Sequence, residues 1–413
     1  MDKISHWFRA LRSPNYRLYF IGQGISLIGS WMQMLAMSWL VYRLTHSSLL
    51  LGVFGFTTQI PMFLLGPVAG VLADRWNRHR MLITTQALLM IQAGLLSLLV
   101  LGHWITEWHI VALGMFLGLV NAFDMPVRHA FVPQLVRTKE ELSNAIALNS
   151  ILFNGARFVG PSIAGMLVAT VGEGICFALN AVSYLAVIGA LLAMRGILDP
   201  PPKPGSKIQG ELRKGLAYAY HCLPIRATLL LVALVSFLGM SYQVLLPIFA
   251  QEILKGGPHT LGFLMSAMGA GAMVAAMHLA SRKSVLGLES IIPQGTLIFG
   301  LGLILFSLSR SLPLSLFLIG FIGFGMMTQM VASNTLIQTV VDEDKRGRIM
   351  SLYTTAFMGI APFGSLFSGA LAHKIGTPRA VLVGGISCAI GALLFLKSLP
   401  KIRQWTESEF HKK

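Results

Sequence analysis

Charged residues are scarce in this sequence of 413 residues. Asp, Glu, Lys and Arg together make up 12% of the chain, whereas 54% of the residues are hydrophobic and the mean hydropathy is +0.69. A soluble domain usually carries about 25% charged residues, which solvate its surface. The composition therefore excludes an ordinary soluble globule, and the high apolar content excludes a disordered chain.

Cysteine is also scarce, and the common ligand and nucleotide motifs are missing. The three cysteines, Cys176, Cys222 and Cys388, are widely spaced, and no Cys-x-x-Cys or His-x-x-x-His pair occurs. This pattern predicts neither a disulfide framework nor a metal site. No Gly-Lys dipeptide occurs, which excludes a Walker A loop. We therefore expect no cofactor, no metal and no enzymatic activity, and we expect any transport to use an ion gradient or to be facilitated only.

Long apolar segments fill most of the remaining sequence. There are twelve, each long enough for a helix of about 20 residues that crosses a bilayer. Strands of a membrane barrel would instead alternate over about 10 residues, which these segments do not do. The sequence thus predicts an all-α membrane protein with twelve transmembrane helices. The segments cover 17–43, 47–73, 81–102, 108–133, 145–170, 174–195, 223–252, 259–281, 290–309, 311–340, 350–372 and 378–397.

The distribution of Lys and Arg predicts the orientation in the membrane. The net charge is +16, but the cations lie at the ends of apolar segments, so no nucleic-acid partner is expected. With the N-terminus inside, 25 of the 32 cations fall on the inner side, five fall on outer loops, and Arg128 and Arg157 fall within spans. The positive-inside rule then predicts that both termini are cytoplasmic. The five outer cations are Arg43, Lys255, Arg310, Lys374 and Arg379.

One long hydrophilic stretch divides the chain near its middle. It covers 196–222 and contains a proline-rich run at 200–204. Six apolar segments precede it and six follow it, so we expect an N-terminal six-helix bundle at 1–195, a cytoplasmic linker at 196–222 and a C-terminal bundle at 223–413. Gly160-Pro161 and Ala361-Pro362 lie 201 residues apart, as in a parallel internal repeat.

The loop between the second and third spans carries the most specific motif. Gly70-Val-Leu-Ala-Asp-Arg-Trp-Asn-Arg-His-Arg80 resembles the loop signature of the major facilitator superfamily, G-x-L-A-D-R-x-G-R-[RK]. Asn77 replaces the second Gly of that signature, and because Asn tolerates positive φ we expect the turn to survive. The resemblance implies a cytoplasmic gate that latches the two pseudo-symmetric halves, and the alternative is that these cations serve topology alone. The gate residues are Gly70, Asp74, Arg75, Arg78 and Arg80.

Several stretches resemble one branch of that superfamily, the bacterial enterobactin (siderophore) exporters, or transmembrane secretion effectors. They are 13–20, 39–44, 59–61 and 121–128. The resemblance implies a monomer in the bacterial inner membrane that exports a small molecule outward, with membrane lipid and protons as its other partners. A siderophore is the expected cargo, and the alternatives are multidrug efflux and a lipid or lysolipid flippase.

Three ionic residues lie within the apolar segments, where each unpaired charge is costly. Asp124 is the carboxylate placed well inside a span, and it precedes Arg128 by four residues, which favours an ion pair on one helix face. We expect Asp124, Arg128 and Arg157 to couple transport to protons or to relay charge. The alternative for Asp124 is that it accepts from Arg75 or Arg78 as part of the latch, and the alternative for Arg157 is that it binds an anionic substrate.

Glycines and polar residues complete the expected site. The segment 155–165 resembles the antiporter motif of superfamily exporters, G-x-x-x-G-P-x-x-G-G, through Gly155, Gly160, Pro161 and Gly165. The alternative for this segment is tight helix packing. The resemblance also implies a substrate cavity lined by polar stripes, for which the alternative is hydrogen bonding between helices. The expected cavity residues are Gln23, Gln33, Gln59, Asn121, Asn154, Tyr242, Gln243, Gln329 and Asn334.

Overall fold

The computed structural model describes residues 8–197, 216–282 and 287–410. For Pro67, Val71, Ala73, Asp74, Asp344 and residues 406–410 it describes the backbone alone. Most of the expected linker at 196–222 therefore lies outside the described residues.

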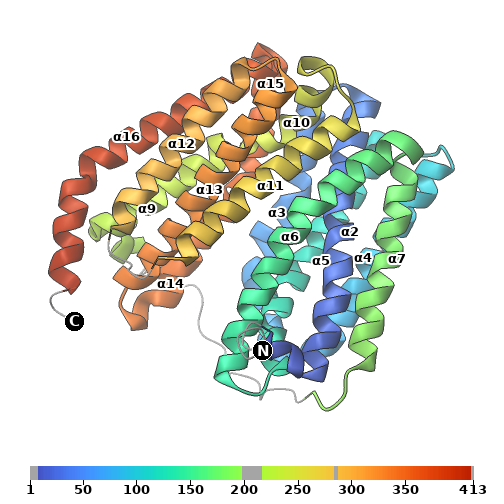
Figure 1. Ribbon diagram of the computed structural model, residues 1–413, viewed down its shortest axis with the longest axis horizontal. Coiled ribbons are helices and arrows are strands. Elements are labelled where there is room, and N and C mark those ends of the chain that lie inside the picture. Colours follow the sequence, from blue (N-terminus) through green and yellow to red (C-terminus); the bar gives the residue numbers. More distant parts are fainter. Residues whose placement is uncertain (1–7, 198–215, 283–286, 411–413) are drawn as a thin grey trace. The chain divides into compact units, whose positions relative to one another are not determined.

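Twelve helices in the described residues are long and apolar enough to cross a membrane, which confirms the expected fold class (Figure 1). The first six spans follow the expected segments to within three residues, except the fifth, which begins six residues earlier, at Lys139. They are formed by α2 (Pro14–Thr45), α3 (Ser48–Arg75), α4 (Arg78–Leu101), α5 (Glu107–Phe131), α6 (Lys139–Val171) and α7 (Glu173–Ala193), with short 3-10 turns η1 (Arg9–Arg12) and η2 (Val132–Leu135).

The other six spans include two that are not continuous α-helices. The regular ones are α11 (Pro258–Ala280), α12 (Leu288–Leu308), α13 (Leu312–Val340) and α16 (Thr377–Phe410). The seventh span consists of α9 (Leu223–Leu234), η3 (Val235–Gly239), η4 (Met240–Leu245), α10 (Leu246–Ile248) and η5 (Phe249–Ile253), and the eleventh of α14 (Glu343–Thr354), η6 (Thr355–Gly359) and α15 (Ala361–Ile375).

The interruption of the seventh span corrects the expectation of one helix over 223–252. The segments η3 and η5 are π-helical and η4 is a 3-10 helix. Pro247 has no amide hydrogen and cannot donate to the Gln243 carbonyl, so Leu246 N–H donates to that carbonyl instead and tightens the turn. In the eleventh span, the π-helical η6 likewise precedes Pro362. Such departures inside a membrane are tolerated where protein surrounds the backbone.

Matching glycines join the last two spans of each half of the sequence. Gly172 is the single residue between α6 and α7, and Gly376 is the single residue between α15 and α16. Their φ angles are +82° and +86°, which residues with a Cβ rarely adopt. The two positions lie 204 residues apart, which is close to the 201 residues between Gly160-Pro161 and Ala361-Pro362.

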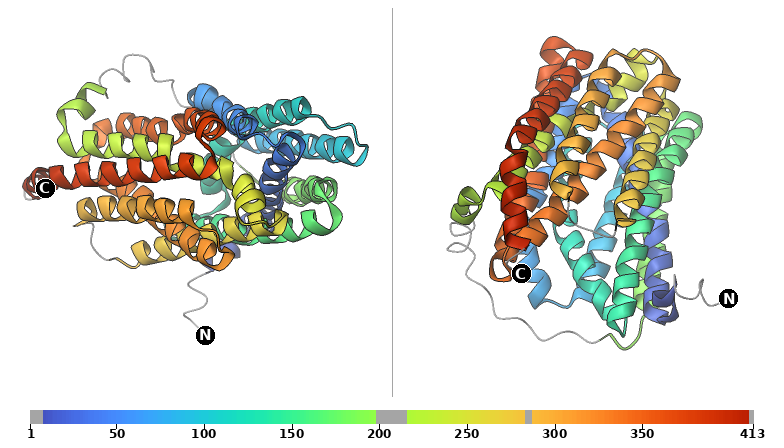
Figure 2. Two further views of the ribbon diagram at one scale, coloured as in Figure 1. Left: turned by 90° about the horizontal axis from the view of Figure 1, so that it is seen from above. Right: turned by 60° about the vertical axis from the view of Figure 1, so that its left-hand side comes forward.

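Contacts between Cα atoms group the chain into two compact units. Unit 1 contains residues 1–46, 57–205 and 256–266, and unit 2 contains 47–56, 206–255 and 267–413. In unit 1, α7 packs against both α2 and α4, and α6 packs against α2. In unit 2, α12 lies between α13 and α16 (Figure 2). The division of the sequence into bundles at 1–195 and 223–413 stays a prediction.

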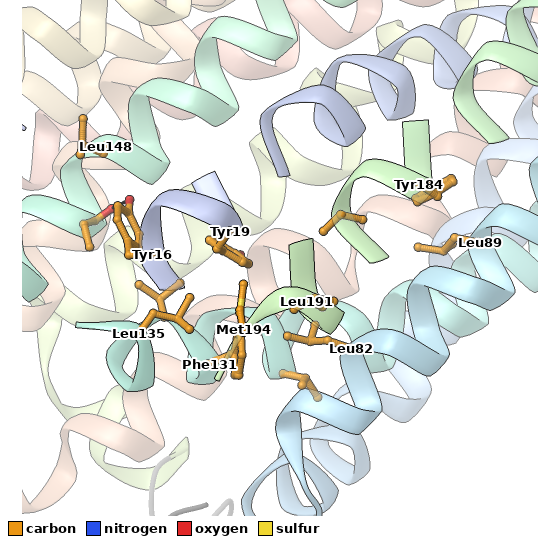
Figure 3. Close-up of a cluster of buried hydrophobic side chains, with 14 of the residues drawn as sticks. Tyr16, Tyr19, Leu82, Leu89, Phe131, Leu135, Leu148, Tyr184, Leu191 and Met194 are labelled. Carbon is orange, nitrogen blue, oxygen red and sulfur yellow. Dashed lines mark hydrogen bonds between the residues drawn. The ribbon is translucent and has the colours of Figure 1, made fainter. Parts of the chain in front are cut away.

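An aromatic and aliphatic cluster fills the core of unit 1 (Figure 3). The stretch 13–20, which the sequence singled out, fixes the start of α2 to this core. Ser13 Oγ donates to the Leu135 carbonyl at 2.5 Å, and Tyr16 OH donates to the Ala145 carbonyl at 2.9 Å. These polar tips anchor a buried aromatic helix end to two other segments of the unit.

Glycine allows the closest helix approaches in both units. A Cβ added at Gly271 of α11 would collide with the Gly320 carbonyl of α13, and one added at Gly118 of α5 would collide with the Thr58 carbonyl of α3. Small residues at such crossings let helix backbones approach within a membrane. A Cβ at Gly94 of α4, in contrast, would meet no atom within 4 Å.

We expect Gly271→Ala to destabilise the protein by about 1–3 kcal/mol, because the added methyl group overpacks the crossing of α11 and α13. Gly94→Ala is the matched control, and it should be neutral or stabilising by up to about 1 kcal/mol, because Ala favours helix. Thermal unfolding of both detergent-purified variants measures the effect. Equal melting temperatures for the two variants would contradict the expectation.

Candidate functional site

A buried ion pair lies in the interior of unit 1. Asp124 of α5 is 0% exposed, and Arg128, one turn later, donates to its Oδ2 atom. Thr85 Oγ1 and Gln86 Nε2 of α4 each donate to the other carboxylate oxygen, Oδ1, at 2.7 Å. The expected pair between Asp124 and Arg128 is thereby confirmed. Three donors from two helices surround one carboxylate, so its negative charge is balanced and its oxygens are occupied.

Aromatic rings close the core of unit 1 near the ends of α2, α5 and α7. Tyr19 packs edge-on against Phe131 with ring centroids 6.3 Å apart (Figure 3). His79 stacks on Phe131 with ring centroids 6.0 Å apart. One ring nitrogen of His79, Nε2, lies 2.8 Å from the Leu191 carbonyl. Arg128 is largely buried near this cluster, with 21% of its side chain exposed. This packing excludes much of the solvent that would otherwise screen the pair.

A second polar network links four helices of the same unit. Gln33 Nε2 of α2 donates to Gln92 Oε1 of α4 at 2.8 Å, and Asn180 Nδ2 of α7 donates to Gln33 Oε1 at 2.7 Å. Gln92 in turn donates to the Leu113 carbonyl of α5 at 3.1 Å. Gln33 was expected in a substrate cavity, and these contacts are those of the alternative interpretation, hydrogen bonding between helices.

The loop between α3 and α4 uses Asn77 differently from the expectation. Its φ is −62°, so the expectation of a positive φ at this position was wrong. Asn77 is the N-cap of α4, and its side chain accepts from the Arg80 amide at 2.8 Å. Asn is among the best N-cap residues, because its oxygen satisfies an amide that has no partner in the first helical turn. Asn at this position therefore caps α4 with its side chain, whereas the Gly of the loop signature would only make the backbone more flexible.

The other residues of the loop motif lie at the ends of the two helices. Arg78 Nη1 donates to the Ala130 carbonyl near the end of α5 at 3.2 Å, and Arg75 and Arg80 are exposed. The Asp74 side chain lies outside the described atoms. Among described residues, the partners of Asp124 are Thr85, Gln86 and Arg128, and neither Arg75 nor Arg78 is among them. The gate role of the motif stays a prediction.

The antiporter-like segment places two of its glycines at helix crossings. A Cβ at Gly160 would lie 2.7 Å from Trp31 Cβ of α2, and a Cβ at Gly165 would lie 2.7 Å from the Pro258 carbonyl of α11. Pro161, between them, is buried. Gly155 has open space where a Cβ would be. Tight packing thus accounts for two of the three glycines, and a role in antiport stays a prediction.

Arg157 lies on the same helix, between these glycines, and is half-buried. Its guanidinium lies over the Trp31 ring, 5.7 Å from the ring centroid. Phe153 packs edge-on against the same tryptophan at 5.7 Å. A cation over an aromatic face is stabilised electrostatically where water is scarce. This contact explains how α6 carries a cation inside an apolar segment.

Two candidate residues in the seventh span face sulfur atoms. Tyr242 OH lies 2.8 Å from Met268 Sδ, and Gln243 Nε2 lies 3.8 Å from the same sulfur and 3.9 Å from Met326 Sδ. Both residues belong to η4, so the irregular backbone of the seventh span presents them to α11 and α13. Met268 and Met326 were not among the expected residues, although methionine is frequent in the chain.

The remaining expected cavity residues lie apart from these clusters. Gln23 is buried, and Gln59, Asn121 and Asn154 are half-buried. In α13, Gln329 Nε2 donates to Ser333 Oγ at 3.4 Å, and Asn334 Oδ1 accepts from Gln338 at 2.5 Å. Their role in substrate binding stays a prediction.

Twelve apolar helices, with charged groups compensated inside them, define a transporter of the major facilitator fold. Two solved structures share this fold. A POT family transporter in complex with 5-aminolevulinic acid is 14% identical with a TM-score of 0.77, covering 94% of this chain and 97% of that one. A bacterial homologue of the iron transporter ferroportin in an inward-facing state is 16% identical with a TM-score of 0.74, covering 94% and 98%.

The sequence identifies the family within this class. Residues 5–412 match the model of the transmembrane secretion effector family, and the chain belongs to that family. The staphyloferrin A transporter of Staphylococcus aureus is 24% identical, covering 96% of this chain and 99% of that protein. Macrolide efflux protein A of Streptococcus pyogenes is 24% identical, covering 93% and 95%, and the multidrug efflux pump Tap of Mycolicibacterium fortuitum is 23% identical, covering 93% of each. The chain is thus a multi-pass bacterial membrane protein that exports small molecules.

We expect Asp124→Asn and Arg128→Gln each to destabilise the protein by about 3–5 kcal/mol, because each leaves a buried charge without its partner. The double variant should lose less than the sum of the two single losses. Equilibrium unfolding of the four proteins in mixed micelles gives the coupling energy.

The matched control is the pair of Lys345 and Asp342, 2.7 Å apart, in which the two side chains are 35% and 45% exposed. The same cycle on that pair should give a coupling of at most about 1 kcal/mol, because solvent screens it. Additive losses at Asp124 and Arg128 would show that the two residues do not stabilise one another.

Proposed function

We propose that this exporter is a secondary active transporter of the bacterial inner membrane, driven by proton entry. The observation that carries the proposal is a fully buried carboxylate, Asp124, inside a membrane-spanning helix and tied to two helices by three donors. A carboxylate is costly at such a place, and ionisable groups inside membranes commonly belong to proton relays.

Protonation of Asp124 has a direct structural consequence. The neutral acid no longer balances the charge of Arg128, and one of its oxygens becomes a donor, whereas Arg128 and the amide nitrogen of Gln86 can only donate. Both contacts weaken when the negative charge is lost, and we propose that the packing of α4 against α5 then changes. In our proposal this change converts proton binding into movement, with Arg128 and Arg157 as the cations that respond.

The loop motif is the proposed cytoplasmic gate. Arg78 donates to the Ala130 carbonyl, which lies six residues after Asp124 on the same helix, α5. A change at the ion pair therefore has a short route to the loop between α3 and α4. We assign Gly70, Asp74, Arg75, Arg78 and Arg80 to this gate, with Gly155, Gly160, Pro161 and Gly165 as the antiporter-like segment.

The proposed transport cycle is alternating access between two six-helix halves, 1–195 and 223–413, joined by the linker 196–222. The 204-residue spacing of Gly172 and Gly376 supports this division. The excess of Lys and Arg on one side supports cytoplasmic termini. We propose that the protein acts as a monomer, with membrane lipid around it and without a nucleic-acid partner.

A siderophore is the proposed cargo. The similarity to a staphyloferrin A transporter along 96% of this chain supports it, and a cation held over Trp31 at Arg157 suits an anionic group of such a molecule. Gln59, Asn121 and Asn154, which are half-buried, are the proposed polar contacts.

Multidrug efflux is the second candidate. The sulfur atoms of Met268 and Met326 beside Tyr242 and Gln243 form a soft, polarisable surface that adapts to varied apolar ligands. The similarity to a macrolide efflux protein and to a multidrug efflux pump supports it. Lipid flipping is a third and weaker alternative.

A transport assay in proteoliposomes tests the coupling. We expect Asp124→Asn to abolish substrate accumulation driven by a pH gradient, while exchange of labelled for unlabelled substrate without a gradient continues. Glu289→Gln is the matched control, because Glu289 is also buried but pairs with Arg403 in unit 2, and it should retain gradient-driven transport. If Asp124→Asn accumulates substrate as well as the wild type does, Asp124 is not the coupling residue.

Comparison of secreted small molecules tests the cargo. We expect a deletion strain under iron-poor growth to secrete at least tenfold less of one chelating compound than its parent does, with no difference under iron-rich growth. Mass spectrometry of culture supernatants measures this. Unchanged secretion together with higher drug accumulation in the deletion strain would favour multidrug efflux instead.

A further inference from the structure

A pocket in unit 2 is lined by two of the five cations that the sequence places on outer loops. It has a volume of about 390 Å³ and lies where α12 ends and α16 begins, at residues 307–310 and 375–382. Arg310 and Arg379 both line it. The positive-inside rule disfavours cations on this side, so two in one pocket need a physical reason.

Neither arginine is neutralised within the described residues. Arg310 Nη1 donates to the carbonyls of Ser307 and Ser309, at 3.2 and 3.0 Å, which are neutral acceptors at the end of α12. No described carboxylate pairs with Arg310 or Arg379. Arg43, another outer cation, is in contrast paired with Glu173 at 2.7 Å.

The position of Arg379 adds to the positive potential. It lies in the first turn of α16, a helix of 34 residues, and no acidic residue occupies that turn. The N-terminal end of a helix carries a partial positive charge, which disfavours a cation there and favours an anion. An anion in the pocket would therefore balance Arg379, Arg310 and the end of the helix together.

Apart from Ser307, the rest of the pocket is apolar. Leu308, Ile375 and Leu382 line it, and Leu308 is 63% exposed. This side of the pocket belongs to membrane-spanning helices, so acyl chains can lie against it. A charged end beside an apolar wall matches a phospholipid in both charge and polarity.

We propose that this pocket binds an anionic phospholipid, with its phosphate between Arg310 and Arg379 and an acyl chain against Leu308 and Leu382. Guanidinium groups bind phosphate oxygens through paired hydrogen bonds. The neutral parts of a lipid headgroup carry no charged oxygens that could accept such a pair. The site is independent of the proposed transport function. The predicted orientation enters in counting Arg310 and Arg379 as outer cations and in assigning the lipid to the outer leaflet.

Native mass spectrometry of the full-length protein in non-ionic detergent tests the site, with phosphatidylglycerol and phosphatidylcholine of identical acyl chains as probes. We expect the wild type to retain one tightly bound phosphatidylglycerol more than the double variant R310Q/R379Q retains. The charge-preserving R310K/R379K should retain more of this lipid than R310Q/R379Q but less than the wild type, because an ammonium cannot form the paired hydrogen bonds. K255Q removes an outer cation that does not line the pocket, so it is the matched control and should keep the lipid.

Equal retention of phosphatidylglycerol by the wild type and R310Q/R379Q overturns the proposal. If that double variant fails to fold, R379Q alone decides, because it leaves the contacts of Arg310 to α12 intact. Unchanged retention in R379Q then overturns the proposal. Inorganic phosphate is added in a second series. If it raises the melting temperature of the wild type as much as phosphatidylglycerol does, the pocket binds free anions and the lipid assignment is wrong.

Discussion

The hydrocarbon core of a bilayer offers no hydrogen-bond partner, and the interior of this protein is arranged around that constraint. Asp124 is fully buried and would be untenable alone, yet Arg128, Thr85 and Gln86 occupy both of its oxygens. The amides of Gln33, Gln92 and Asn180 satisfy one another in the same way. Because these contacts join α4 to α5 and join α2 to α4 and α7, polar satisfaction also fixes which helices are neighbours.

The same constraint governs the backbone. Continuous helices bond their own amides, and most spans here are continuous. The seventh span departs from this rule around Pro247. Its backbone groups bond through the tighter turns of a 3-10 helix and the wider turns of a π-helix. Ser236 Oγ donates to the Phe357 carbonyl in the π-helical part of the eleventh span. Where the backbone hydrogen bonds within a helix are interrupted, side chains of a neighbouring helix supply hydrogen bonds. Tyr242 and Gln243, the proposed substrate contacts, lie in the irregular segment of the seventh span.

Export requires that such an interior have two arrangements of similar energy. A buried ion pair can favour either arrangement, because adding one proton changes its charge and its balance of hydrogen-bond donors and acceptors. An apolar core has no group that a proton can bind. The loop before α4 lies close to this element through Arg78 and the end of α5. Proteins similar to this chain are named for staphyloferrin A, for macrolides and for multidrug efflux, so the energy-coupling residues and the residues that select cargo are expected to be separate.

The sequence by itself determined the number of spans, the fold class and the family, because bilayer thickness sets segment length and the signature loop is local in sequence. It also indicated the pair of Asp124 with Arg128, since residues four apart share a helix face. Only the tertiary structure decided the rest. Thr85 and Gln86 lie 39 and 38 residues from Asp124, and Asn180 lies 147 residues from Gln33, so their contacts depend on which helix faces turn toward one another. The local pattern at Asn77 could not distinguish a positive φ from a helix cap, because the same side chain serves both, and the start of α4 settled which one forms.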